Sequence, residues 1–240
     1  MIKYYCYEKC YSTDEQKLEI KDDNNSIIIT NNLNLKSIII NNPNIRNIII
    51  ENCPNLIELK CNYNNIHTMI IINCMKLSTL PTNITNIINL ELSYTNIKEI
   101  SNNLTQLECL LINTCPVKDL PKELTSIKRL SLNNCLLSQL PDELININDL
   151  YIYNCEKFNK LSVYFINICK LIIKNCNNII IIPKTYKKLK YLALVKCINI
   201  GIVPDYSTIN DIYIKNCFKL RDIVKSYYYN ENYFINFFKD

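Results

Sequence analysis

The sequence is poor in the residues on which many catalytic loops depend. It has one glycine, Gly201, one histidine, His67, and no tryptophan. A single glycine excludes the glycine-rich loops that hold phosphate groups in nucleotide-binding enzymes. His67 has no nucleophile and acid at a recognisable spacing, which argues against a catalytic triad. Paired carboxylates such as Asp22-Asp23 and Asp142-Glu143 fall in polar, turn-like stretches, so we expect no enzymatic activity.

Long apolar runs and metal-ligand clusters are also missing. The longest apolar run, Ile179 to Pro183, is far shorter than the roughly 18 residues of a transmembrane helix. The first residues, MIKYYCYEKC, are too polar and too short for a signal peptide. Cys6 and Cys10 have no further ligands at a spacing suited to metal. We therefore expect no membrane span, no metal and no cofactor.

One repeated pattern fills most of the chain instead. Leu120 to Cys135 reads LPKELTSIKRLSLNNC, and related copies recur every 20 or 21 residues. A period of this length predicts a solenoid, in which each repeat stacks on its neighbours. The copies end at Asn32, Cys53, Cys74, Thr95, Cys115, Cys135, Cys155, Cys176, Cys197 and Cys217.

Each copy contains a short alternation of apolar and outward positions, such as Leu130-x-Leu132, which predicts a strand with one buried face. Ten such strands predict a parallel sheet. In the later repeats a Leu-Pro pair, as at Pro121, predicts that the connecting segment is one turn of 3₁₀ helix or an extended path, because proline leaves too few residues for a helix. In the first repeats, residues 38–40 and 59–61 are strand-like and predict a second, smaller sheet.

The residue that closes each repeat predicts a structural ladder. Eight of the thirteen cysteines occupy this position, and we expect each side chain to face inward and to bond main-chain groups of the next repeat. An unpaired buried main-chain group costs about 1–3 kcal/mol, which such a ladder avoids. Buried, reduced thiols fit an intracellular compartment. With glycine almost absent, asparagine is expected at left-handed turn positions.

The two ends of the chain depart from the repeat. Residues 1–17 lack the period and carry aromatic and charged residues. Residues 224–240 are rich in tyrosine and phenylalanine. Solenoids need caps because an end repeat exposes an apolar face. We therefore expect an N-terminal cap at 1–17, the solenoid at 18–223 and a C-terminal cap at 224–240, with a partner-binding peptide as the alternative for the last segment.

The consensus Leu-x-x-Leu-Pro-x-x-Leu-x-x-Ile-x-x-Leu-x-Leu-x-Asn-Cys resembles the leucine-rich repeat family over roughly residues 18–223. Repeats that end in Cys and carry Leu-Pro look like those of plant immune receptors, the 20-residue length is similar to bacterial effector repeats, and the composition resembles that of AT-rich protists or giant DNA viruses of amoebae. The resemblance implies a curved right-handed superhelix with about ten parallel strands on its concave face. It also implies a cytoplasmic scaffold for protein–protein interaction, located in the host cytoplasm if the chain is viral.

In that family the exposed strand positions of the concave face recognise the partner. Residues 1–150 hold 13 basic and 16 acidic residues, and residues 151–240 hold 14 and 6, so the second half is basic. Tyrosines interleaved with lysines suit an acidic or phosphorylated protein surface. Nucleic-acid or polyanion binding through the same half is the alternative, and no small-molecule substrate is expected. The predicted partner-binding residues are Ile49, Ile70, Glu91, Leu111, Arg129, Tyr151, Tyr153, Lys170, Ile172, Lys174, Tyr191, Lys196, Tyr213 and Lys215.

Overall fold

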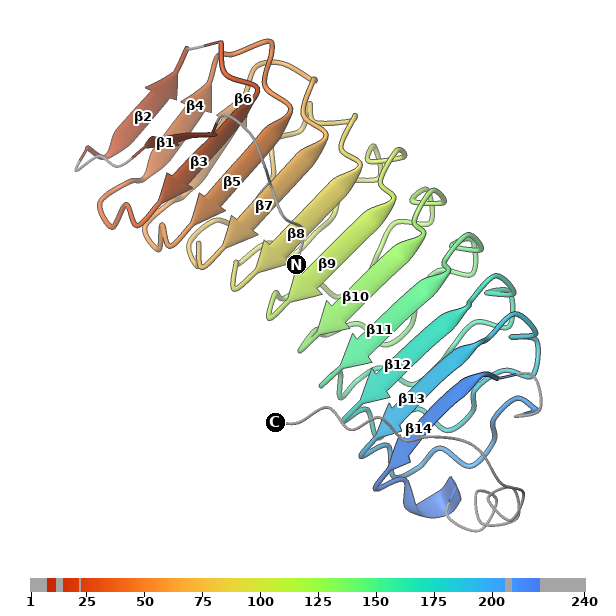
Figure 1. The fold of residues 1–240 in the computed structure, drawn as a ribbon. Coiled ribbons are helices and arrows are strands. Elements are labelled where there is room, and N and C mark those ends of the chain that lie inside the picture. The colour runs from red at the N-terminus through yellow and green to blue at the C-terminus, as the bar shows by residue number, and fades with distance from the viewer. Residues whose placement is uncertain (1–7, 12–14, 22, 206–208, 221–240) are drawn as a thin grey trace.

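A computed structural model describes residues 8–11, 15–21, 23–205 and 209–220. It is a parallel-strand solenoid, in which one long sheet runs from end to end and the connecting segments lie behind it (Figure 1). The predicted fold class is confirmed. The predicted C-terminal cap at 224–240 lies outside the described residues, as do Cys6 and most of the predicted N-terminal cap.

The main sheet has eleven strands in the order β1-β3-β5-β7-β8-β9-β10-β11-β12-β13-β14. Each expected strand is present, and β1 adds one within the expected N-terminal cap, where it pairs with β3 in parallel. The bounds are β1 Glu8–Tyr11, β3 Ser26–Thr30, β5 Asn47–Glu51, β7 Thr68–Ile72, β8 Asn89–Ser93, β9 Cys109–Asn113, β10 Arg129–Asn133, β11 Asp149–Tyr153, β12 Lys170–Lys174, β13 Tyr191–Val195 and β14 Asp211–Lys215.

A second sheet covers the back of the first repeats only. It consists of β2 (Lys17–Ile20), β4 (Ser37–Ile40) and β6 (Glu58–Cys61), paired in parallel. The two strand-like segments seen in the sequence therefore do form a sheet, with β2 as its third strand. From the fourth repeat onward most connecting segments contain a proline, and no further strand pairs with β6 in the described residues.

The proline-containing segments follow an extended path broken by two successive turns. The amide of Leu124 donates to the carbonyl oxygen of Pro121 at 3.4 Å, and the amide of Ile127 donates to that of Leu124 at 3.3 Å. Each bond joins a carbonyl to the amide three residues on, as in a single 3₁₀ turn, and the backbone between the two turns is extended, so the segment combines the two predicted alternatives. Within the described part of the chain, a 3₁₀ helix occurs only at η2 (Phe218–Leu220), after the last strand.

The core is a stack of apolar layers, one from each repeat. The second and fourth residues of each main-sheet strand from β3 to β14 point inward, as Leu130 and Leu132 do in β10, where both are fully buried. Leu124 and Ile127 of the turns close the layer from behind and are also fully buried. Each buried leucine or isoleucine removes apolar surface from water, which stabilises the fold by about 1.5–3 kcal/mol.

In the main sheet, the residue that follows each strand from β3 to β14 takes a left-handed conformation. Its φ lies between 51° and 57°, and seven of these ten residues are asparagine, as the shortage of glycine predicted. The backbone amide of each turn is directed along the solenoid. For example, the amide of Asn134 donates to the carbonyl oxygen of Tyr153 in the next repeat at 2.9 Å. The turns therefore extend the hydrogen-bond ladder beyond the strands.

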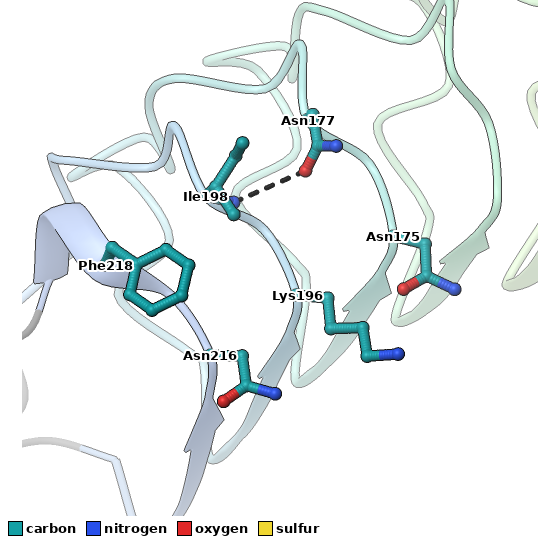
Figure 2. A pocket seen from close by; sticks show the side chains of 6 residues that line it. All are labelled: Asn175, Asn177, Lys196, Ile198, Asn216 and Phe218. Atoms are coloured by element: carbon teal, nitrogen blue, oxygen red, sulfur yellow. Dashed lines mark hydrogen bonds between the residues drawn. The ribbon is translucent and has the colours of Figure 1, made fainter.

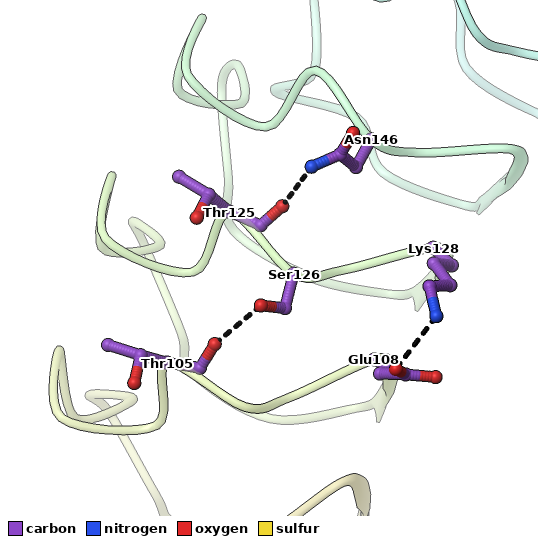
Figure 3. A network of polar contacts seen from close by, with 6 residues as sticks. All are labelled: Thr105, Glu108, Thr125, Ser126, Lys128 and Asn146. Carbon is purple, nitrogen blue, oxygen red and sulfur yellow. Dashed lines mark hydrogen bonds and ion pairs between the residues drawn. The ribbon is translucent and has the colours of Figure 1, made fainter.

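A further set of polar contacts joins consecutive repeats at the other edge, where the chain enters each strand (Figure 3). Ser126 Oγ donates to the carbonyl oxygen of Thr105 at 2.6 Å, and Asn146 Nδ2 donates to that of Thr125 at 2.9 Å. Lys128 Nζ lies 2.7 Å from Glu108 Oε1. Such exposed ion pairs add little stability, whereas the repeated main-chain contacts hold neighbouring repeats in register.

Candidate functional site

Three columns of side chains point outward from the main sheet, at the first, third and fifth positions of the strands from β3 to β14. We call this surface the sheet face. Because successive side chains of a strand alternate between faces, the predicted partner-binding residues separate cleanly by column. Arg129, Lys170 and Tyr191 are in the first column, Ile49, Ile70, Glu91, Leu111, Tyr151, Ile172 and Tyr213 in the central column, and Tyr153, Lys174 and Lys215 in the third.

Two isoleucines of the apolar first half of the sheet face are nearly buried. Ile49 and Ile70 lie next to each other in the central column, and their exposed fractions are only 9% and 8%. These two isoleucines therefore offer little area to a partner, although the sequence placed them on an exposed stripe.

Glu91 follows Ile70 in the central column and is half-buried. Burial raises the pKa of its carboxyl group above the ordinary value, and the charge of Glu51 adds to this rise. Glu51 lies in the third column of β5 and was not among the predicted residues. The first half of the sheet face therefore carries two carboxyl groups among its apolar side chains.

The second half carries a cluster of cations and rings. Lys170 Nζ lies 4.8 Å from the ring centroid of Tyr191 and 5.6 Å from that of Tyr151, within the range of cation–π attraction. Beside it, Arg129 donates to Asp149 through Nε at 3.3 Å and Nη2 at 3.2 Å. This bond raises the pKa of Arg129 and holds the guanidinium in place.

The third column continues the cluster along the ends of the same strands. Tyr153 is half-buried, and burial raises the pKa of its hydroxyl group. Lys174 and Lys215 are exposed, and Val195 lies between them. Together with Tyr151, these residues form a surface of half-buried rings between exposed ammonium groups.

The structure moves one predicted residue off the sheet face. β13 ends at Val195, and Lys196 follows it in the left-handed turn with φ 52°. Lys196 therefore lies at the edge of the sheet. Two residues that were not predicted, Asp149 and Asp211, share the first column with Lys170. The sequence could have revealed both, because each directly precedes the first inward residue of its strand, Leu150 or Ile212.

The residue that closes each repeat, such as Cys135, is buried just after the carboxyl end of the strand. Cys135 Sγ donates to the carbonyl oxygen of Asn133 in its own strand at 3.3 Å and to that of Ile112 in the preceding repeat at 3.5 Å. The partner is thus the preceding repeat, whereas the sequence predicted the next one. Burial raises the pKa of Cys176 to about 12, so its thiol stays protonated and donates to Ile152 and Lys174 in the same way.

No group of three or more potential metal ligands occurs among the described residues. Nor does this part of the chain contain a helix that is long and apolar enough to cross a membrane. The described side chains of the sheet face instead include rings, an Arg–Asp ion pair and exposed ammonium groups.

A solved structure has a similar architecture. The leucine-rich repeat domain of the type III effector XopL matches with a TM-score of 0.55 and 18% identity, over 65% of this chain and 62% of that one. The chain has the leucine-rich-repeat fold. Neither a protein-family model nor a curated protein matches the sequence.

Two further leucine-rich-repeat structures are more distant. The plant peptide hormone receptor RGFR1, solved in complex with RGF2, matches with a TM-score of 0.46 and 14% identity, over 87% of this chain and 45% of that one. The functional domain of InlJ from Listeria monocytogenes, which includes a cysteine ladder, matches with a TM-score of 0.34 and 14% identity over 78% and 62%. The chain thus spans less than two thirds of each of these structures.

Proposed function

We propose that this chain is a non-enzymatic protein-recognition module of the cytoplasm, which binds a partner protein through the sheet face of β10 to β14. The observation that carries the proposal is the position of Lys170 between the rings of Tyr151 and Tyr191. The cluster is ordered before any partner arrives, and preorganised contact groups lose little conformational entropy on binding.

The two halves of the sheet face contribute unequally to this proposal. Ile49 and Ile70 are nearly buried, whereas Tyr151, Tyr153 and Tyr213 keep part of their surface exposed. Tyrosines combine large contact area with few rotatable bonds, and lysines steer acidic surfaces toward them. The partner surface that fits is therefore acidic, with apolar groups that pack on the rings. Repeat solenoids commonly use such extended faces for binding.

The test is retention of proteins from nuclease-treated lysate of the source or its host on the immobilised chain, read by mass spectrometry. The variant Tyr151→Ala/Tyr213→Ala should lose a discrete protein that the parent chain retains. The matched control is Tyr63→Ala/Tyr164→Ala, because these tyrosines are exposed but lie away from the sheet face. Thermal unfolding of all variants checks that the solenoid is intact.

Three outcomes would contradict the proposal. Equal loss in both double variants would show that the sheet face has no special role. A large loss of stability in Tyr151→Ala/Tyr213→Ala would show that these rings belong to the core. Retention that disappears with nuclease, or that falls steeply with salt, would favour polyanion binding through the basic half.

A further inference from the structure

A notch of about 410 Å³ lies at the edge of the solenoid, beyond the ends of β12, β13 and β14 (Figure 2). Its lining comes from three consecutive repeats: Asn175 and Asn177, then Lys196 and Ile198, then Asn216 and Phe218. None of these residues belongs to a strand. The notch is therefore separate from the sheet face, and binding in the notch does not depend on the proposed function.

The notch lies where a ladder of side-chain amides is interrupted. Along the left-handed turns, Asn73 Nδ2 donates to Asn52 Oδ1 at 2.8 Å, and Asn175 Nδ2 donates to Asn154 Oδ1 at 2.6 Å. The next rung is Lys196, which cannot continue this chain of amides. Within the described part of the chain, neither Lys196 Nζ nor the side-chain amide of Asn216 has a hydrogen-bond or ion-pair partner.

The backbone at Lys196 is costly to maintain. Its φ of 52° is left-handed, a conformation that costs roughly 1–2 kcal/mol for a residue with an ordinary side chain and that asparagine adopts more readily. Seven of the ten equivalent positions are asparagine. A cation has thus replaced the residue that the turn prefers, at the edge of a notch that also contains the unpaired amide of Asn216.

The surroundings of Lys196 are positive on one side and apolar on the other. Lys174 and Lys215 are the last residues of β12 and β14 and directly precede Asn175 and Asn216. The described residues that line the notch include no acidic residue. Ile198 and Phe218 form its other wall, with exposed fractions of 39% and 66%.

We propose that this notch binds the C-terminal carboxylate of a peptide whose last side chain is large and apolar. The carboxylate oxygens accept hydrogen bonds from Lys196 Nζ and from Asn216 Nδ2. These bonds favour a carboxylate over a neutral group, since charge-assisted hydrogen bonds are about twice as strong as neutral ones. The terminal side chain packs on Phe218 and Ile198. A C-terminal residue carries both groups on one Cα, which matches a notch with a cationic and an apolar wall.

The test uses nuclear magnetic resonance of the ¹⁵N-labelled full chain, with the side-chain amide signals of Asn175, Asn177 and Asn216 as reporters. Three probes separate the features of the ligand: N-acetyl-L-leucine, its uncharged amide N-acetyl-L-leucinamide, and N-acetylglycine, which lacks the apolar side chain. We expect saturable shifts with N-acetyl-L-leucine and affinities lower by about tenfold or more for the other two.

The variant Lys196→Asn removes the cation and restores the amide ladder, so it should fold at least as well as the parent chain and still lose binding about tenfold or more. Lys184→Asn, at an exposed position on the opposite side of its repeat, removes the same charge and should bind normally. Phe218→Ala should weaken N-acetyl-L-leucine but not N-acetylglycine. Equal binding of the amide, of N-acetylglycine or by the Lys196→Asn chain would overturn the proposal.

Discussion

Asn175 Nδ2 donates a 2.6 Å hydrogen bond to Oδ1 of Asn154, the residue at the same turn of the preceding repeat, and both residues have a left-handed backbone. One residue type thus satisfies two demands at once, the unusual φ and the bond to the neighbouring turn. Glycine would satisfy only the first. This explains how a chain with a single glycine forms seven of its ten left-handed turns, the seven that carry asparagine.

The turn at Thr114 should be improved by asparagine. Thr114 has φ 53°, and a β-branched side chain is disfavoured there. Its hydroxyl accepts a hydrogen bond of only 3.4 Å from Asn134 Nδ2. Thr114→Asn should therefore stabilise the fold by about 1 kcal/mol, which corresponds to a rise in Tm of about 2–4 °C. Thermal unfolding followed by circular dichroism measures this.

Thr125→Asn is the matched control for that change, because Thr125 lies in an exposed turn without a left-handed backbone. Its Tm should be unchanged. A decrease in Tm for Thr114→Asn would show that the hydrogen bonds of the Thr114 hydroxyl, from Asn134 Nδ2 and to Asn113 Oδ1 at 3.1 Å, outweigh the backbone preference.

The carboxyl group of Glu91 should make stability depend on pH. Burial raises its pKa in the folded chain, so the folded state binds the proton more tightly than the unfolded state does. The resulting stability is present below the unfolded pKa and is lost as pH rises through the folded value. Glu91→Gln should therefore raise the Tm at pH 7, and the difference from the parent chain should shrink toward zero near pH 3. A difference that grows on acidification would contradict this assignment.

Glu123→Gln provides the comparison for the pH series. Glu123 lies in an exposed turn of the back segment, so the substitution should leave the Tm nearly unchanged at both pH values. Any general effect of removing one negative charge would appear in both variants.

The periodic sequence predicted the fold because its repeats determine the inward positions. Leu130 and Leu132 mark a strand and its buried face, and the spacing of 20 or 21 residues to the next copy fixes the parallel pairing. The same logic located the second sheet from residues 38–40 and 59–61 and the left-handed asparagines from the scarcity of glycine. The sequence did not predict β1, because residues 8–11 lack the alternation. Only the pairing with β3 identifies them as a strand.

The candidate site was less accessible to sequence reasoning because it depends on distances between repeats. The alternation correctly put Ile49 and Ile70 on the outward face, but it carries no information on how much of each side chain stays exposed there. Lys196 was aligned one residue too far into its strand. The notch beside it requires contacts among three repeats, which no single copy of the pattern contains.

The closing column gives a paired test of the inward ladder. Cys135 is 3% exposed and Leu136, the next residue, is 38% exposed. Cys135→Tyr should destabilise the fold by about 3 kcal/mol, because the packed interior has no room for a ring. The substitution also removes the donor to the carbonyl oxygens of Ile112 and Asn133. Leu136→Tyr should change the free energy of unfolding by no more than about 0.5 kcal/mol. Unfolding in guanidinium chloride measures both, and similar losses in the two variants would show that the column does not confine the side chain.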